Sequence, residues 1–152
     1  MKQEHKELLL KDLSARVPYG VKVEAKVPVN RTDYKEFIDK VTSVSYNIDI
    51  VQVGNTDVIV GYEPHFEIKP YLFPLSSMTE EQRYDFYCRF IENEIDYNDF
   101  KEFYFENNMW HKMLTSIDDC DSVVDWFNKY HFDYRGLIPM GLAKDATNSI
   151  VY

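Results

Sequence analysis

Hydrophobic residues near the start of the chain recur at helical spacing. Leu9, Leu13 and Val17 are four residues apart and lie among Lys, Glu and Arg. This pattern predicts an amphipathic helix over residues 3–16, with its apolar side turned towards a core. The Pro-Tyr-Gly sequence at 18–20 is expected to end the helix, because proline and glycine both interrupt helical structure.

A different periodicity follows. Valine and alanine alternate with charged residues from position 21 to 27, which predicts a half-buried antiparallel strand that ends at Pro28. After a polar loop, Asp33 and Glu36 have the spacing of helix-capping residues. We therefore expect a short helix over residues 34–40.

Three short runs rich in β-branched residues come next, at 41–46, 48–53 and 57–62. The Gly-Asn-Thr sequence at 54–56 separates the last two runs and is typical of a tight turn, so these runs should pair as an antiparallel hairpin. About four short strands with tight turns suggest a curled antiparallel sheet or a small SH3-like barrel. The fold class predicted for the whole chain is α+β.

The segment 69–90 is a junction between the strand-rich and the helix-rich parts of the chain. Pro70 and Pro74 are expected to exclude a central strand or a helix interior here. A helix should follow, because Ser77 has Glu three residues later and Thr79 has Gln three residues later, and both spacings fit a capping box. The sequence alone leaves open which of the two caps the helix.

The second half of the chain is predicted to be helical. Aromatic residues recur at helical spacing over about 79–94 and should pack on the sheet, while 96–114 suggests a further helix and a last helix should reach about His131. The apolar segment that follows is expected to dock on the rest of the protein. We expect one domain over residues 1–143, with a sheet part at about 20–75 and a helical part at about 77–143. Residues 144–152 should form a loose tail.

Composition supports a folded chain with one core. The 152 residues are 45% hydrophobic and 16% aromatic, with only five glycines, which excludes global disorder. The net charge of −9 is uneven, because residues 76–108 carry nine acidic and three basic side chains. Such a negative field repels nucleic acids and anionic membranes. It could attract a basic partner, imitate the charge of DNA, or simply keep a helix face solvated.

No apolar run approaches the length of a membrane span, and the first residues lack the apolar core of a secretory signal. We therefore expect a cytoplasmic protein. Cys88 and Cys120 are the only cysteines. In a reducing compartment they are more typical of buried thiols than of a disulfide, although their pairing stays open.

Known catalytic and metal-binding spacings are missing from the chain. The histidines, cysteines and carboxylates form no HExxH, CxxC or calcium-loop pattern, and no GxSxG or glycine-rich phosphate loop occurs. We therefore expect a non-enzymatic protein without metal or cofactor. The aromatic-rich segment 126–136 reads as a structural clasp or as a binding surface, in which Asp133 and Arg135 pair with each other or with backbone groups.

Residues that combine aromatic or charged side chains outside the expected core are the candidates for contacting a partner. They are Tyr97, Phe100, Glu102, Tyr104, Glu106, Trp110, Tyr134 and Arg135.

Three segments carry a resemblance to known sequences. They are KELLLKDLSARVPYGVKV at 6–23, IKPYLFPLSSMTEEQ at 68–82 and DWFNKYHFDYRGLI at 125–138. Together they resemble the signature segments of a family of small uncharacterised proteins encoded by prophages and mobile elements of gut bacteria. The family has no established activity, so the resemblance implies a setting, the cytoplasm of a host bacterial cell, and assigns no catalytic residue.

These observations lead to two functional hypotheses. The first is a non-enzymatic accessory protein of a phage or mobile element that binds another protein, with an acidic surface that could inhibit a host defence system. The alternative is a small-molecule or nucleotide binder, or an enzyme of unknown reaction, that uses a cleft near Tyr134 and Arg135.

Overall fold

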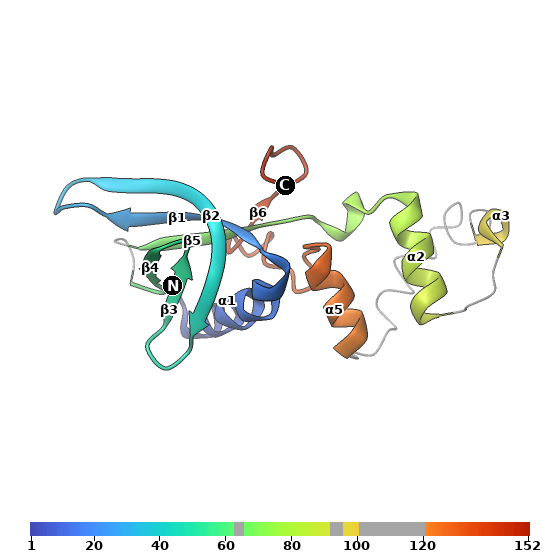
Figure 1. The fold of residues 1–152 in the computed structure, drawn as a ribbon, viewed down its shortest axis with the longest axis horizontal. Coiled ribbons are helices and arrows are strands. Elements are labelled where there is room, and N and C mark those ends of the chain that lie inside the picture. Colours follow the sequence, from blue (N-terminus) through green and yellow to red (C-terminus); the bar gives the residue numbers. More distant parts are fainter. Residues whose placement is uncertain (63–65, 92–95, 101–120) are drawn as a thin grey trace. The chain divides into compact units, whose positions relative to one another are not determined.

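A computed structural model describes residues 1–62, 66–91, 96–100 and 121–152 of the chain (Figure 1). The chain divides into two compact units. Unit 1 comprises Met1–Leu75 together with Asp125–Tyr152, and unit 2 comprises Ser76–Val124. Because the two units are described separately, the expectation of a single domain over residues 1–143 stays a prediction.

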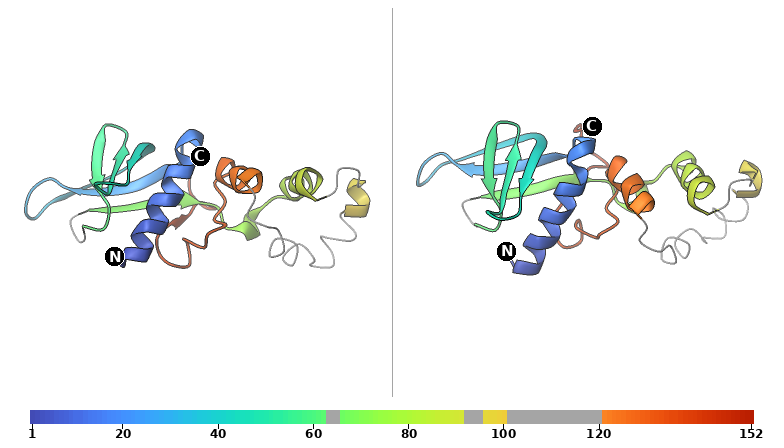
Figure 2. Two further views of the ribbon diagram at one scale, coloured as in Figure 1. Left: turned by 90° about the horizontal axis from the view of Figure 1, so that it is seen from below. Right: turned by 60° about the horizontal axis from the view of Figure 1, so that its bottom comes forward.

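Unit 1 begins with helix α1, Gln3–Arg16, as predicted. A 3-10 turn, η1 at Val17–Tyr19, follows, and Gly20 ends it with a φ of 67° that favours glycine. Leucines on one side of α1 pack into the main hydrophobic core, together with side chains from the strands. The helix lies across one face of the sheet (Figure 2).

Strand β1, Lys22–Pro28, confirms the alternating pattern. Val23 and Ala25 are fully buried in the core, whereas Lys22, Glu24 and Lys26 are only half-buried on the opposite face. The side-chain period of two therefore sets which face of this strand meets α1.

The predicted helix over 34–40 is wrong, because these residues form the first half of strand β2, Tyr34–Ser45. They pair with β1 from Pro28 opposite Tyr34 to Lys22 opposite Lys40. Asp33, expected as a helix cap, instead belongs to the hairpin turn, where its carbonyl accepts the Val29 N–H at 3.0 Å. A ladder to a neighbouring strand outweighs a local capping preference here.

The hairpin around residues 54–56 is confirmed. Strands β3, Ile50–Val53, and β4, Thr56–Ile59, pair antiparallel, with Val53 opposite Thr56. Gly54 has a φ of 56°, as a tight turn requires. The other side of β3 pairs with the second half of β2, from Val41 to Ser45.

Strand β5, Glu67–Leu72, pairs antiparallel with β1, and β6, Lys144–Asp145, pairs with β5 in parallel. The strand order is β4-β3-β2-β1-β5-β6. The α+β class is therefore confirmed, but the sheet has six strands, is mixed and is not closed. The SH3-like barrel is accordingly not shown.

The expectation that Pro70 excludes a central strand is wrong. Pro70 lies within β5 opposite Val23 of β1. Strand β6 pairs only with Tyr71 and Leu72, so on that side of β5 its ladder begins after the proline. Pro70 thus occupies a locally one-sided position of the sheet, which is where a missing N–H is tolerated.

The last nine residues are ordered against the sheet, which differs from the loose tail expected from the sequence. Ala146 donates its N–H to the Leu72 carbonyl at 2.8 Å, and the Tyr152 hydroxyl donates to the Tyr71 carbonyl at 2.9 Å. Ala146 and Val151 are buried beside Tyr71. The preceding apolar segment docks as expected, since Leu137, Leu142 and Ala143 belong to the main core.

Unit 2 contains helix α2, Glu80–Phe90, and the short helix α3, Tyr97–Phe100. Thr79 caps α2 through a capping box with Gln82, while Ser77 lies in a 3-10 turn, η2 at Leu75–Ser77. The structure therefore selects Thr79 from the two predicted caps. The packing of α2 on the sheet stays a prediction, and the rest of the helix expected over 96–114 lies outside the described residues.

Helix α5, Asp121–Lys129, corresponds to the last predicted helix. Its apolar side includes Val123 and Phe127, which are both buried. None of the helices in the described ranges is long and apolar enough to cross a membrane. The cytoplasmic location stays a prediction.

Candidate functional site

A buried ion cluster, formed by Asp12, Arg16 and Arg135, joins α1 to the C-terminal part of unit 1. The Arg16 Nε donates to Asp12 Oδ2 at 2.7 Å and its Nη2 donates to Oδ1 at 3.0 Å. Both side chains are fully buried. Arg135 completes the cluster, with its Nε 3.3 Å from Asp12 Oδ1. One carboxylate thus lies between two guanidinium groups, and its two bonds to Arg16 are the pairing that a buried charge requires.

The cluster also fixes the backbone of the segment after α5. Arg16 Nη2 donates a second hydrogen bond to the Phe132 carbonyl at 2.8 Å, across 116 positions of sequence. The segment is held from the other side as well, because Phe73 donates its N–H to the His131 carbonyl and accepts from the Asp133 N–H. Residues 131–133 are therefore tied both to α1 and to the end of β5.

Tyr134, one of the predicted partner-binding residues, lies within this arrangement. Its ring stacks on Phe127 with centroids 5.4 Å apart, and the guanidinium carbons of Arg16 and Arg135 lie 5.5 and 4.6 Å from the ring centre. Such contacts stabilise a cation over an aromatic face. Burial raises the pKa of the Tyr134 phenol. Tyr134 and Arg135 thus serve the packing of unit 1 in this structure.

Asp133 pairs with backbone groups, which was one of the two alternatives left open by the sequence. Its carboxylate accepts the Leu137 N–H at 2.7 Å and the Ile138 N–H at 2.8 Å. Arg135, the other alternative, pairs with Asp12 instead. The contacts of Asp133 and Arg135 therefore agree with the interpretation of segment 126–136 as a structural clasp.

His131 is buried beside the ion cluster and stacks on Tyr152, with ring centroids 4.5 Å apart. Burial, together with the positive charge of Arg16, lowers the pKa of this imidazole to about 4. The neutral histidine is thus the form that the folded unit accommodates.

We expect stability to fall as the pH drops from about 6.5 towards 4. In that window His131 binds a proton in the unfolded chain but stays neutral in the folded one. The free energy of unfolding therefore falls by up to about 3 kcal/mol. The His131→Asn variant should flatten this dependence, and asparagine tolerates the φ of 57° at this position. Urea unfolding at a series of pH values measures the slope, with His5→Asn as the matched control. An equal slope in wild type and His131→Asn would contradict the assignment.

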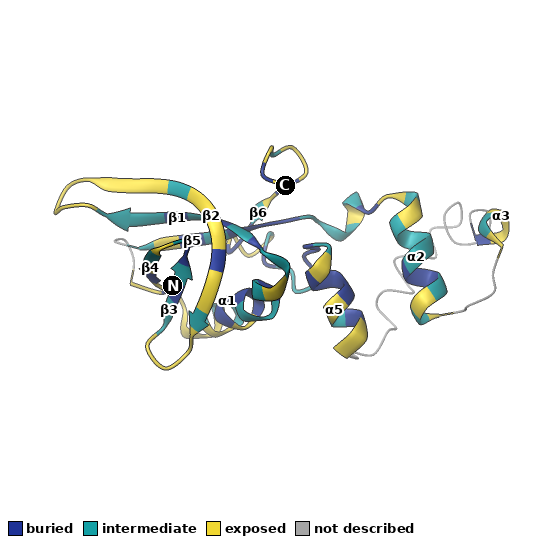
Figure 3. Ribbon diagram, viewed as in Figure 1, coloured by how far each residue is buried: buried dark blue, intermediate teal, exposed yellow. Residues whose placement is uncertain are grey.

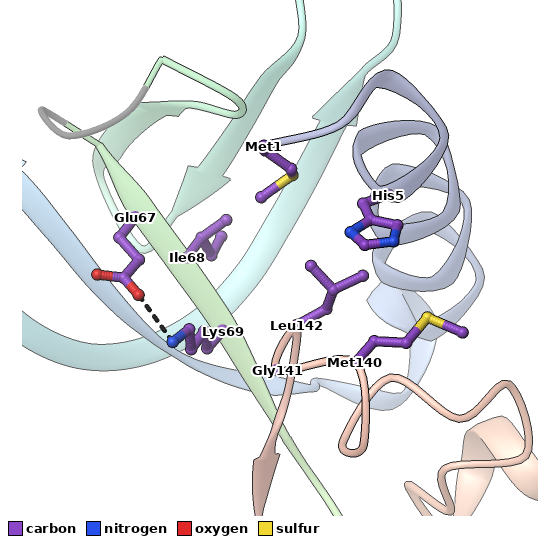
Figure 4. Close-up of a pocket in the computed structure, with 8 residues that line it drawn as sticks. All are labelled: Met1, His5, Glu67, Ile68, Lys69, Met140, Gly141 and Leu142. Atoms are coloured by element: carbon purple, nitrogen blue, oxygen red, sulfur yellow. Dashed lines mark ion pairs between the residues drawn. The ribbon is translucent and has the colours of Figure 1, made fainter.

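A hollow of about 220 Å³ lies between the start of α1, β5 and the turn at 140–142 (Figure 4). Its wall combines apolar side chains with polar groups, which are the His5 ring and the Lys69–Glu67 ion pair of 2.8 Å. Neither Tyr134 nor Arg135 lines it. No pattern in the sequence indicates this hollow, because its residues come from three distant segments without any shared motif.

The structure describes two of the predicted partner-binding residues of unit 2, Tyr97 and Phe100. Phe100 is fully buried and packs on Tyr84 and Tyr87 of α2, at ring separations of 5.5 and 5.3 Å. Tyr97 is half-buried and donates its hydroxyl to Glu80 Oε1 at 2.7 Å. This bond, with desolvation and the nearby negative charges, raises the pKa of the Tyr97 phenol to about 12. Four further candidates lie outside the described residues, namely Glu102, Tyr104, Glu106 and Trp110.

Metal binding and thiol chemistry find no support in the part of the chain that the structure describes. There, no three His, Cys, Asp or Glu side chains are placed to hold a metal ion. Cys88 is a half-buried free thiol on α2, while Cys120 lies outside the described ranges.

Comparison with known proteins found no matching family model, no similar curated protein and no similar solved structure.

Asp12 and Arg16 are the residues of the ion cluster that the sequence analysis did not single out. Their signal was present, since opposite charges four residues apart lie on a helix beside Leu9 and Leu13. The same spacing is common on exposed helix surfaces. The burial of the Asp12–Arg16 pair becomes apparent only in the fold, where Phe132 and Arg135 contact it.

Proposed function

We propose that this protein is a non-enzymatic accessory protein of a phage or mobile element, and that it binds another protein through the acidic surface of unit 2. The observation that carries the proposal is the separation of charge between the two units. Residues 76–124 hold twelve acidic and four basic side chains, a net charge of −8, whereas the other 103 residues hold 14 and 13, a net charge of −1.

The described part of unit 2 has exposed acidic side chains, fully buried aromatic rings and other rings that are half-buried. Glu81, Asp96 and Asp99 are exposed, whereas Phe86 and Phe100 are fully buried. The buried rings thus contribute to packing, and the exposed carboxylates are the groups that a partner can reach. A surface with this charge attracts basic proteins and repels nucleic acid and anionic membranes.

A sharper form of the proposal is inhibition of a host defence system. A nucleic-acid-binding protein of such a system carries a basic groove for the phosphate backbone. An acidic unit can occupy that groove by imitating the charge of DNA. The resemblance of segments 6–23, 68–82 and 125–138 to proteins of prophages and mobile elements supports this setting.

Unit 1 acts in this proposal as the scaffold that carries unit 2. The ion cluster and the pairing of β5 with β6 hold its two sequence segments together. The alternative function, a small-molecule or nucleotide site, would need Tyr134 and Arg135 to face a ligand. Arg135 belongs to the ion cluster and Tyr134 packs against it instead, so we base the proposal on unit 2.

Charge inversion tests the proposal. We expect the variant with Glu81→Lys and Asp99→Lys to bind a partner captured from host cells at least about tenfold more weakly than wild type, and we expect salt to weaken wild-type binding. The matched control carries Glu4→Lys and Asp57→Lys on exposed positions of unit 1, with the same change in net charge. Titration of the purified partner by calorimetry gives both affinities.

Equal weakening by the two variants would show a response to net charge alone and would overturn the assignment to unit 2. Binding that is indifferent to salt would exclude the charge-mimicking form. Failure to capture a stoichiometric partner across several hosts would count against protein binding altogether.

A further inference from the structure

The first half of strand β2 is an open edge within the described sheet. Strand β2 pairs with β1 through residues 34–40 but with β3 only through Val41–Ser45. Among the described residues, no strand pairs with the outer side of 34–40. The β1–β2 hairpin extends from the body of unit 1 and is mostly exposed along β2 (Figures 1 and 3).

The backbone groups along this edge alternate in direction. Val41 donates its N–H to the Val21 carbonyl at 3.0 Å, on the β1 side, whereas the Lys40 carbonyl accepts from Gly54 on the opposite side. Because the direction alternates with each residue, Glu36 and Ile38 direct their N–H and C=O groups away from β1. These groups can pair with an added strand without breaking the β1–β2 ladder.

The side chains of the edge give a self-complementary pattern when it pairs antiparallel with itself. With Phe37 opposite Phe37 of the second copy, Lys35 lies opposite Asp39, and Glu36 and Ile38 exchange backbone hydrogen bonds. The Asp39 carboxylate lies on the open side, next to Gly54. Opposite charges that face each other across strands stabilise the pairing.

Other two-fold registers lack this match. Centring the pairing on Glu36 would place Glu36 opposite Glu36 and Asp33 opposite Asp39. Centring it on Ile38 would place Phe37 opposite Asp39. Like charges that face each other across strands are destabilising, so the sequence of this edge favours the register centred on Phe37.

We propose that a second copy of this chain pairs with this edge, through residues 35–39 of both copies, to form a weak two-fold dimer with a continuous sheet. The exposed Ile38, half of whose surface is accessible to water, is covered in part by this pairing. Gly54 limits the length of the new ladder, because it already occupies the carbonyl of Lys40. The interface is thus restricted to the protruding hairpin.

Charge reversal and charge exchange test the dimer. Sedimentation velocity over a concentration series should show wild type in monomer–dimer exchange. We expect Lys35→Asp and Asp39→Lys each to raise the dissociation constant at least about tenfold, because each changes two symmetry-related pairs from attraction to repulsion. The double exchange, Lys35→Asp with Asp39→Lys, should restore the wild-type value.

Asp57→Lys on strand β4 is the matched control, since it makes the same change of charge on a different edge strand of the sheet. It should leave the dissociation constant unchanged, and circular dichroism should show the same fold for every variant. A wild type that stays monomeric at high concentration overturns the proposal. A dimer that is unaffected by the single reversals, or not restored by the exchange, overturns it equally.

Discussion

Asp12→Ala is expected to lower the free energy of unfolding by about 3–5 kcal/mol. The carboxylate of Asp12 is fully buried and neutralises Arg16, which is also fully buried, and it lies beside the half-buried Arg135. Its removal leaves the Arg16 guanidinium without a counter-ion in a region without water contact. Breaking a buried ion pair on one side carries a cost of this order. Urea denaturation of the full-length protein measures it.

Two further variants separate the ion cluster from a general effect of mutation. Glu67→Ala removes one partner of the partly exposed pair with Lys69 and should cost at most about 1 kcal/mol. Combining Asp12→Ala with Arg16→Met should recover part of the loss, because the double variant no longer buries an unpaired guanidinium. Losses that simply add would contradict the proposed cause.

Asp133→Ala is expected to lower the free energy of unfolding by about 2–4 kcal/mol. The carboxylate satisfies two backbone N–H groups, of Leu137 and Ile138, in a region where Leu137 is fully buried. Hydrogen bonds to a charged acceptor are stronger than neutral ones, and buried donors left without a partner are costly. Urea denaturation gives the total, and hydrogen exchange at the two amides shows whether the loss is local.

The chain offers a matched comparison for Asp133. Asp145 also accepts a backbone N–H from a residue that follows it closely, that of Thr147 at 2.8 Å, but its side chain is exposed. Asp145→Ala should therefore cost no more than about 1 kcal/mol. Similar losses at both positions would show that burial does not determine the contribution of these carboxylates.

Elements with strong local signals could be predicted from the sequence. The spacing of leucines in α1, the alternation in β1, the turn at Gly54 and the capping box at Thr79 each agree with the structure. In these cases the local preference and the tertiary environment favour the same conformation.

Elements that depend on distant partners could not be predicted in this way. Residues 34–40 form a strand because β1 supplies a hydrogen-bonded partner strand. Pro70 is tolerated in β5 because the pairing of β5 with β6 starts only at the next residue, Tyr71. The end of the chain is ordered by β5, which lies over 70 residues earlier in sequence. Local patterns carry no information about such partners.

The candidate site shows the same division. Tyr134 and Arg135 were expected near a functional surface, and their positions against Arg16 and Asp12 depend on contacts between opposite ends of unit 1. The acidic character of unit 2 follows directly from the sequence, because charge needs no partner to be counted.

The division of unit 1 into two sequence segments has a consequence for synthesis of the protein. A ribosome releases α1 and strands β1–β5 well before residues 125–152. Until then the apolar surface that later meets Leu137 and Leu142 lacks part of its cover. The 49 residues of unit 2 must emerge during this interval, so the nascent sheet is most exposed to aggregation and proteolysis while the acidic insertion is being translated.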